Sequence, residues 1–428
     1  MSRTMFLVKP RRRLQFVIYG LPAAALSFPL IPFAVYLPAH YAVELGLGFI
    51  AVGIALFVSR LLDVASDPLA GWLSDWTLNR FGSRKPWILA GSLLAAIALH
   101  RLCLPETAPS ALYLGVWSSL LYVGWTFIMV PYHALGSDIS SSTTDNTTIA
   151  GYREMFSLMG MLAALSLPLF VDISPLKIIP GIIVPAGAIL LIFMMIYVRE
   201  PTQAAHPMHT GKSTIIAQFK TVLQNPSVKR LCSVWFLASV ASAIPAALFP
   251  LYVDAVLGGD SDVRNLSIII YFGAAVASMP IWSAVTRYKS KASVMAFGMT
   301  VACIAFPAAL FVGEGDQHAF YGICIVTGFA LGAEILLAPA ILADLISPGK
   351  DTQTPSVAAT HFALWGIVTK VAFAVAIAVS FSLMELISTS HWLSADLGIA
   401  MLYAALPIAF KAPSVGLLRS LASPDSKD

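Results

Sequence analysis

Long apolar segments follow one another along almost the whole chain, and short polar stretches separate them. A helix that crosses a bilayer needs about 20 mostly apolar residues, and twelve segments of roughly this kind can be delimited. The last is the weakest, because its uninterrupted apolar run is short. The pattern predicts an all-α membrane protein with twelve transmembrane helices. We expect these helices at residues 14–38, 47–75, 86–104, 111–137, 150–171, 179–199, 228–253, 266–287, 292–313, 319–346, 356–386 and 394–411.

The basic residues predict how these spans are oriented. Most of the 26 Lys and Arg residues fall in the two terminal tails and in alternate loops, and only Arg101, Lys177 and Arg264 fall on the opposite side. Cytoplasmic loops of membrane proteins carry an excess of Lys and Arg. We therefore expect both termini in the cytoplasm, most simply at the inner membrane of a bacterium.

The chain divides into two similar halves around its longest polar stretch, residues 199–230. The fourth span ends in residues 131–138 and the tenth in residues 339–344, each running from a proline to an aspartate at the same membrane side. Chance likeness between Ala- and Leu-rich helices is the alternative explanation. Two six-helix halves joined by a cytoplasmic linker are typical of the major facilitator fold. The predicted parts are an N-terminal half at 1–200, a linker at 201–227, a C-terminal half at 228–412 and a cytoplasmic tail at 413–428.

Composition narrows the class of protein further. Soluble proteins contain about 25% charged and roughly 45–50% apolar residues, whereas this chain of 428 residues has 11% charged and 58% hydrophobic residues. That excludes a soluble enzyme, a nucleic-acid-binding protein and a disordered scaffold. The four cysteines stand alone in apolar runs, which argues against a zinc site or a disulfide framework. No P-loop and no nucleophile–base arrangement is visible, so we expect no catalysis.

Three charged residues lie close together in the second predicted span, where a charge costs at least about 2.5–3.5 kcal/mol. The spacing of Arg60, Asp63 and Asp67 places them on one helical face. Two carboxylates one turn apart repel each other unless a cation, a proton or a basic neighbour neutralises one of them. The group predicts a site for Na⁺ or H⁺, and a structural ion-pair network is the alternative. The Asp67-Pro68 step predicts a local helix break that frees backbone carbonyls.

Two further charges lie in spans of the second half. Lys370 is near mid-depth in span eleven and needs an acidic partner. Glu334 on span ten is the nearest candidate by depth, and the acids of the first helix bundle are the other candidates. A lysine that snorkels toward the cytoplasm is the alternative. We expect Arg60, Glu334 and Lys370 to take part in coupling.

Residues 71–85 form a basic, Gly-containing turn after the second span. The pattern predicts a cytoplasmic latch, in which Asp75 lies near the end of a neighbouring helix. We expect the basic side chains of this turn, Arg80, Arg84 and Lys85, to lie at the lipid surface. An ordinary positively charged cytoplasmic loop is the alternative.

Several segments resemble a known family. The chain reads RLLDVASDPLAGWLSD at 60–75 and GSRKPW at 82–87. It also reads VPYHAL at 130–135, GYR at 151–153 and ALW at 363–365. These segments resemble the glycoside–pentoside–hexuronide:cation symporters of the major facilitator superfamily, and the resemblance extends over the whole chain. Lipid symporters of animals belong to the same broader group.

The resemblance implies specific roles for residues of this chain. It implies a cation site formed by Asp63, Asp67 and the hydroxyl of Thr126, with Na⁺ or H⁺ as the coupling ion and no other cofactor or metal. It also implies that Lys370 is essential. The sugar-binding pattern departs from that of the family, because Ser27 and Met129 stand where the family has acids and His133 stands where it has a tryptophan. The candidate substrate-binding residues are Ser27, Met129, Tyr132, His133, Arg153 and Trp365.

The leading hypothesis is a cation-coupled secondary symporter of a sugar or related small solute that works by alternating access. The missing acids leave open a transporter of an amphipathic or lipid-like solute. A non-transporting membrane factor on the same fold is the third possibility. We expect a monomer that contacts its solute and the bilayer and does not bind nucleic acid.

Overall fold

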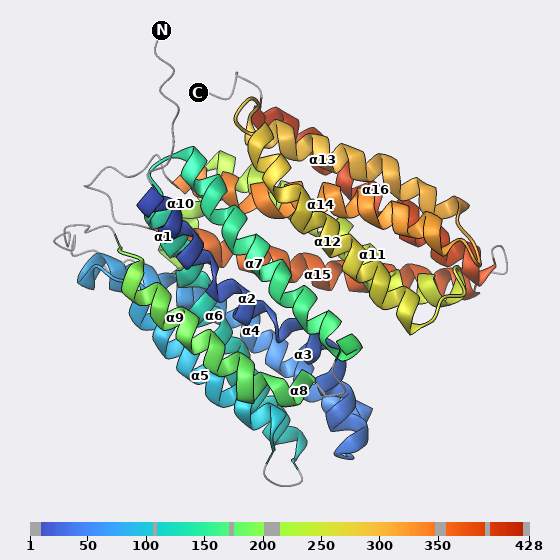
Figure 1. Ribbon diagram of the computed structural model, residues 1–428, viewed down its shortest axis with the longest axis horizontal. Coiled ribbons are helices and arrows are strands. Elements are labelled where there is room, and N and C mark those ends of the chain that lie inside the picture. The colour runs from blue at the N-terminus through green and yellow to red at the C-terminus, as the bar shows by residue number, and fades with distance from the viewer. Residues whose placement is uncertain are drawn as a thin grey trace. The chain divides into compact units, whose positions relative to one another are not determined.

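The computed structural model describes residues 10–105, 109–170, 175–200, 215–346, 357–389 and 394–422. Every regular element among these residues is a helix (Figure 1). The chain forms two compact units: unit 1 comprises Met1–Lys212 and Ser347–Phe362, and unit 2 comprises Ser213–Ile346 and Ala363–Asp428. The long helix α15 (Ala358–Thr389) therefore begins in unit 1 and continues in unit 2.

Unit 1 begins with a first span built from three short helices and a π-helical turn. Prolines at the start of α2 and inside α3 accompany this segmentation, because proline cannot donate the backbone hydrogen bond that a continuous helix needs. The elements are α1 (Pro10–Gly20), α2 (Pro22–Ser27), α3 (Leu30–Ala39), η1 (His40–Glu44), α4 (Phe49–Phe81), α5 (Lys85–Cys103), α6 (Ala111–Asp138), α7 (Thr143–Phe170), α8 (Pro175–Ile178), η2 (Ile179–Ile183) and α9 (Val184–Tyr197).

Unit 2 contains a short amphipathic helix, α10, followed by longer apolar ones. Its elements are α10 (Ile215–Gln224), α11 (Pro226–Ala255), α12 (Ser261–Val285), α13 (Lys291–Ala305), η3 (Phe306–Phe311), α14 (Gln317–Ile346), the larger part of α15, and α16 (Ala395–Ala422). The helix α14 packs against α12 and α13, and α16 packs against α11 and α13.

Helices occupy each of the twelve predicted spans. Ten described segments are long and apolar enough to cross a membrane. The other two predicted spans coincide with α4 and α7, which have 33 and 28 residues and carry several charged side chains. Both are longer than the roughly 20 residues that a crossing requires.

Two predicted boundaries differ from the structure. The helix α16 continues to Ala422, so it runs through most of the segment that we assigned to a cytoplasmic tail. The predicted linker contains α10, and its residues 201–214 lie outside the described part of the chain, as do residues 423–428 of the tail.

Small residues allow close helix packing inside each unit. A Cβ atom built on Gly124 of α6 would lie 2.9 Å from the backbone nitrogen of Ala95 on α5. In unit 2, a Cβ on Gly328 of α14 would lie 2.1 Å from the carbonyl oxygen of Tyr271 on α12. Such contacts are typical of membrane helices, where small side chains let backbones approach each other.

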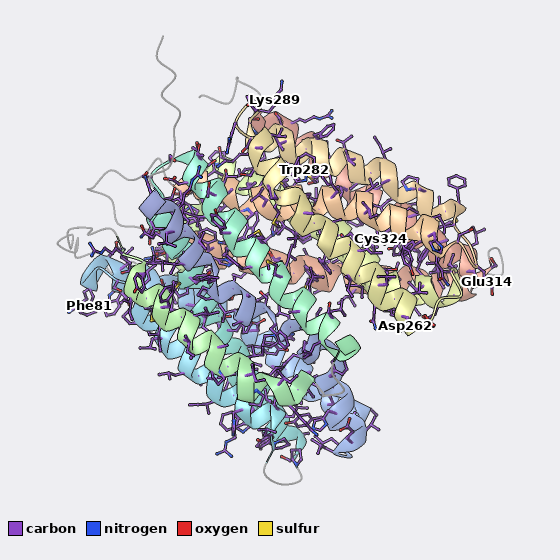
Figure 2. The ribbon with its side chains drawn as sticks, in the orientation of Figure 1. Phe81, Asp262, Trp282, Lys289, Glu314 and Cys324 are labelled. Carbon is purple, nitrogen blue, oxygen red and sulfur yellow. The ribbon has the colours of Figure 1, made fainter. Side chains whose placement is uncertain are left out.

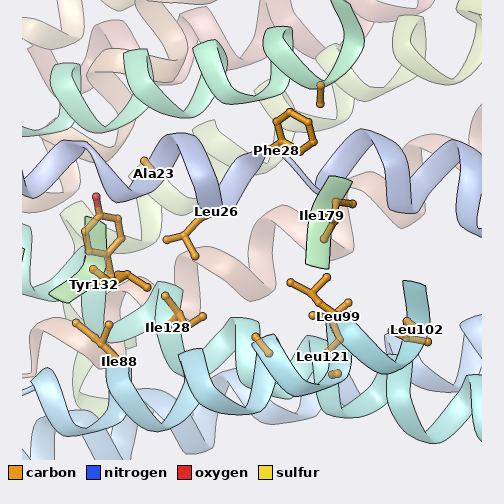
Figure 3. Close-up of a cluster of buried hydrophobic side chains, with 14 of the residues drawn as sticks. Ala23, Leu26, Phe28, Ile88, Leu99, Leu102, Leu121, Ile128, Tyr132 and Ile179 are labelled. Atoms are coloured by element: carbon orange, nitrogen blue, oxygen red, sulfur yellow. The ribbon is translucent and has the colours of Figure 1, made fainter. Parts of the chain in front are cut away.

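The buried core of unit 1 lies between the helices of its first, third and fourth spans. Figure 3 shows Leu26 of α2, Ile88 of α5 and Ile128 of α6 in one cluster with Tyr132. This cluster holds α6 in a fixed position, and α6 supplies one of the residues of the candidate site.

Candidate functional site

The three residues that the family resemblance assigns to a cation site lie together in unit 1. The hydroxyl of Thr126 on α6 lies 3.2 Å from Asp63 Oδ1 and 3.1 Å from Asp67 Oδ1, both on α4. The exposed fractions of Asp63, Asp67 and Thr126 are 4%, 2% and 3%. A hydroxyl has one hydrogen, so Thr126 can donate to only one of the two carboxylates at a time.

Arg60 lies at the edge of this group. Its Nη1 atom is 3.7 Å from Asp63 Oδ2, and its side chain is 61% exposed. The guanidinium carbon lies 4.2 Å from the centre of the Tyr122 ring, within the range of a cation–π interaction. Arg60 therefore balances the charge of Asp63 only from a distance and from an exposed position.

The predicted helix break at Pro68 does not occur, because α4 is one helix from Phe49 to Phe81 with Pro68 inside it. Proline has no N–H, so the carbonyl of Val64 still lacks its usual helical donor. The Ser66 hydroxyl donates to the carbonyl oxygen of Asp63 at 2.8 Å. Carboxylate, hydroxyl and carbonyl oxygens are hard ligands of the kind that bind alkali cations and protons rather than soft metals.

The cytoplasmic turn of unit 1 is organised around Arg84, which is fully buried rather than at the lipid surface as predicted. Its Nε donates to Asp138 Oδ2 at 2.6 Å, and its Nη1 donates to Asp75 Oδ1 at 2.7 Å and to Ser74 Oγ at 3.0 Å. Burial acts to lower the pKa of Arg84, but the adjacent charges of Asp138 and Asp75 outweigh it and raise the pKa above its ordinary value. Arg84 therefore stays charged and joins α4 to α6.

Asp75 also binds the start of α15, where unit 1 contains the first turn of that helix. The backbone nitrogens of Ala359 and Thr360 donate to Asp75 at 3.0 and 2.8 Å, and the Thr360 hydroxyl donates at 2.7 Å. A carboxylate at a helix N-terminus satisfies free N–H groups and interacts favourably with the helix dipole. The predicted position of Asp75 beside a helix end agrees with this geometry.

The other two basic residues of the turn, Lys85 and Arg80, differ in their contacts and exposure. The Lys85 ammonium donates to the carbonyls of Met195 and Val198 at 2.9 and 2.7 Å, so it caps the end of α9, and the residue is half-buried. Arg80 is exposed as predicted, with its guanidinium 5.5 Å from the Trp76 ring centre.

A similar ion pair closes the corresponding end of unit 2. The Lys291 ammonium, at the start of α13, lies 2.6 Å from Asp344 near the end of α14. Asp138 and Asp344 are the two aspartates that end the predicted internal repeat, and each binds a basic residue at the start of the preceding helix. The contacts support the repeat that the sequence suggested.

The candidate substrate residues of unit 1 form a polar and aromatic group. The Ser27 hydroxyl lies 2.6 Å from that of Ser157. Tyr19 and Tyr132 each donate their hydroxyl to the other's backbone carbonyl, at 2.8 and 2.5 Å, and their rings stack with centroids 4.6 Å apart. Met129 is half-buried on the same helix as Tyr132.

Arg153 and His133 lie near this group. The Arg153 guanidinium is 5% exposed and binds the neighbouring Glu154 at 2.6 Å, a pairing that the sequence analysis did not consider. The half-buried His133 ring makes an edge contact with Phe362, with centroids 5.6 Å apart.

In unit 2 the Trp365 ring stacks on Trp235 with centroids 4.6 Å apart, and the Trp235 indole donates to Thr369 at 2.8 Å. Lys370 is half-buried in the same helix, and its acidic partner stays a prediction.

Glu334 has a basic partner at the end of the twelfth predicted span. The Lys411 ammonium of α16 lies 2.6 Å from Glu334 Oε1, and both side chains are buried. The helix α16 continues beyond Lys411 to Ala422, so Lys411 lies inside the helix rather than at its end. Glu334 is thus bound by Lys411, and the partner of Lys370 stays a prediction.

Sequence comparison identifies the family of this chain. The model of the family described as "MFS/sugar transport protein" matches residues 18–420. The chain belongs to this family. The match confirms the resemblance that the sequence motifs predicted, and with the ten candidate spans it makes the chain an integral membrane protein.

Two relatives illustrate the range of the group. Sodium-dependent lysophosphatidylcholine symporter 1 of Homo sapiens is 25% identical over 344 residues, which cover 70% of this chain and 61% of that protein. The putative glycoside/cation symporter YagG of Escherichia coli (strain K12) is 30% identical over 156 residues, which cover 35% of this chain and 34% of that protein. The matches span less than two thirds of either relative.

A solved structure shows the same fold. The fucose:proton symporter FucP of E. coli superposes with a TM-score of 0.66 at 12% identity, covering 96% of this chain and 98% of that one. The predicted major facilitator fold is therefore confirmed, whereas an identity this low carries no information about substrate.

Proposed function

We propose that the protein is a cation-coupled symporter that moves a small solute across a membrane by alternating access. The observation that carries the proposal is the pair of buried carboxylates, Asp63 and Asp67, on either side of the Thr126 hydroxyl. Ionisable residues inside membrane helices are costly and mark ion or proton pathways. Na⁺ or H⁺ is the proposed coupling ion.

Coupling follows from the charge of this site. Two adjacent carboxylates repel each other when both are ionised, and their negative charge disfavours any dehydrated intermediate of the transport cycle. A bound cation neutralises the site and lowers the free energy of that intermediate. We propose that Lys370 contributes to this balance, as the family resemblance implies.

We further propose that the substrate is larger or less polar than a simple galactoside. Sugar hydroxyls are best held by carboxylates, which accept strong charge-assisted hydrogen bonds. At the two positions where the resemblance predicts such acids, Ser27 shares a hydrogen bond with Ser157 and Met129 offers only a thioether. Aromatic rings, including those of Tyr132 and Trp365, supply apolar contact area.

An amphipathic, lipid-like solute is the second candidate. It is favoured by the relative that is a lysophosphatidylcholine symporter and that matches 70% of this chain. Arg153 with Glu154 provides a charged pair near the aromatic group, to which a zwitterionic head group could bind. A non-transporting factor is disfavoured, because it would have no use for Asp63 and Asp67.

Transport into proteoliposomes tests these proposals. Purified protein is reconstituted with an imposed Na⁺ or H⁺ gradient, and uptake of a sugar panel and of a lysophospholipid is measured. Asp63→Asn and Asp67→Asn keep the side-chain shape and remove the charge, so they should abolish gradient-driven accumulation. The matched control is Asp254→Asn, which changes an exposed acid of α11. Full accumulation by both site variants with unchanged ion dependence would refute the cation site.

Calorimetry tests the substrate class separately. A Na⁺-dependent galactoside affinity in the micromolar range, about −8 kcal/mol, would show that the departures at Ser27 and Met129 do not matter. In that case the sugar proposal would stand in its simplest form.

We propose that both termini lie in the cytoplasm, at the inner membrane of a bacterium, and that the protein acts as a monomer. The distribution of basic residues supports the orientation. Within unit 2, Lys289 lies at one end of the helices and Asp262 and Glu314 lie at the other (Figure 2). Cysteine labelling of residues at the two ends in whole cells would test it.

A further inference from the structure

Unit 2 contains a buried ion pair that no step of the proposed coupling uses. Glu334 on α14 and Lys411 on α16 are 2.6 Å apart, with exposed fractions of 2% and 3%. The Lys411 ammonium also lies 3.3 Å from the Ser242 hydroxyl on α11. Three helices of unit 2 thus place a carboxylate and a hydroxyl around one positive charge.

Stability alone is a weak reason for such a pair. Replacing a buried ion pair by apolar residues of similar volume is often neutral or stabilising, because desolvation of both charges offsets their attraction. Inside a membrane protein an ionisable residue is more often connected with ions or transport. The neighbouring ionisable groups are Tyr271 of α12 and Cys303 of α13, and each interacts electrostatically with Glu334.

The internal repeat relates this pair to the candidate cation site. Thr126 lies five residues before Pro131, and Glu334 lies five residues before Pro339. Gly124 and Gly332 occupy matching positions two residues earlier. The repeat therefore places Glu334 where unit 1 has the Thr126 hydroxyl.

The two positions differ in the source of positive charge. Around Thr126, two carboxylates and a hydroxyl lie together, and the exposed Arg60 contacts Asp63 at 3.7 Å. Around Glu334, the ammonium of Lys411 supplies the positive charge and is attached to the chain. An ammonium carries the same charge as Na⁺ but cannot leave the site.

We propose that Lys411 is a tethered cation that permanently fills a cation site in unit 2, so that exchangeable cations bind only in unit 1. The site itself is inferred from the contacts of Glu334, Lys411 and Ser242. Its consequence, that an ion gradient acts through Asp63 and Asp67 alone, rests on the proposed function.

Replacing Lys411 by an uncharged residue tests the proposed cation site of unit 2. Lys411→Met leaves Glu334 and Ser242 around an uncompensated negative charge, which should then bind Na⁺ or a proton from solution. The measurements use full-length protein in detergent: bound radioactive Na⁺ by equilibrium dialysis, and proton uptake by calorimetry in buffers of different ionisation enthalpy. In this first series every variant carries Asp63→Asn to remove binding in unit 1, whereas the variants of the second series keep Asp63.

Asp63→Asn alone should show no saturable cation binding. Adding Lys411→Met should restore a saturable binding event for Na⁺ or H⁺, and further addition of Glu334→Gln should abolish it. The matched control adds Arg264→Met, which removes the basic partner of the exposed Asp254 and should restore nothing. Absence of any cation binding in the folded Asp63→Asn/Lys411→Met protein would overturn the proposal.

A second variant tests the proposal if the Lys411→Met protein does not fold. Glu334→Gln/Lys411→Met has no buried charge at this site and should keep the cation binding of the unsubstituted chain. Loss of that binding in a folded double variant would show that the pair belongs to the exchangeable site, which overturns the proposal. If the unsubstituted chain binds no cation but Lys411→Met gains binding, the proposed function fails and the tethered cation stands.

Discussion

Replacing Arg84 by methionine should destabilise unit 1 strongly. The Arg84 side chain is fully buried, and its nitrogens lie 2.6 Å from Asp138 and 2.7 Å from Asp75. Removing one partner of a buried ion pair costs about 3–5 kcal/mol, because the remaining charge is left uncompensated. Here one guanidinium serves two carboxylates. For a unit of about 150–250 residues each kcal/mol shifts Tm by roughly 2–4 °C, so Tm should fall by roughly 6–20 °C.

Tryptophan fluorescence during heating of the purified protein measures this shift. Arg84→Lys keeps a positive charge but lacks the planar fork that reaches both acids, so its Tm should fall between those of Arg84→Met and the unsubstituted chain. Arg264→Met breaks the exposed pair with Asp254 and should cost less than about 1 kcal/mol. A loss for Arg84→Met no larger than that for Arg264→Met would refute the reasoning.

The pH dependence of this loss has a definite sign. Because Asp138 and Asp75 raise the pKa of Arg84 above its ordinary value, the contribution of Arg84 is present at all pH values below the ordinary one and falls only in strong alkali. In Arg84→Met, acid supplies protons that neutralise the two buried carboxylates that have lost the guanidinium. The Tm difference between the variant and the unsubstituted chain should therefore narrow as pH falls, and a widening difference would contradict this account.

Three further predictions concern transport and packing. Lys370→Ala should block coupled uptake while the protein still inserts and folds, and uptake at the unsubstituted rate would contradict a coupling role. Gly160→Ala should lower Tm, since its Cβ would lie 2.0 Å from the carbonyl oxygen of Ala24 and force α7 away from α2. Gly53→Ala on α4 meets no atom within 4 Å and should leave Tm unchanged or raise it, because alanine favours helix.

The positions of the helices could be predicted because apolar length is a local property of the chain. Asp63 and Asp67 could be recognised for a similar reason, since their spacing alone puts them on one helical face. Their contact with Thr126 could be inferred only from the family resemblance, because it joins residues of two different helices.

The burial of Arg84 could not be predicted from its surroundings in the sequence. It follows an exposed Phe81 in a basic turn, which is typical of a solvated cytoplasmic loop. What buries it is the convergence of Asp75 and Asp138 from α4 and α6, the second of which is 54 residues away. Long-range charge pairing of this kind leaves no local pattern.

The pairing of Lys411 with Glu334 could not be predicted for a different reason. The residues after Lys411 include Pro413 and are less apolar, which predicts a helix end, yet α16 contains both Pro407 and Pro413 and continues to Ala422. Proline is tolerated in membrane helices when neighbouring groups satisfy the freed carbonyls. Glu334, the partner that stabilises a lysine at this depth, lies 77 residues earlier in the chain.

The basic contacts described at the two buried acidic sites differ in strength, and this difference bears on where we propose that an ion exchanges. Lys411 contacts Glu334 at 2.6 Å with both groups out of water, where solvent screens the attraction little. Arg60 contacts Asp63 at 3.7 Å with a side chain that is 61% exposed. Exposed ion pairs contribute about 0–1 kcal/mol. Arg60 therefore competes only weakly with a solution cation for Asp63 at the proposed site.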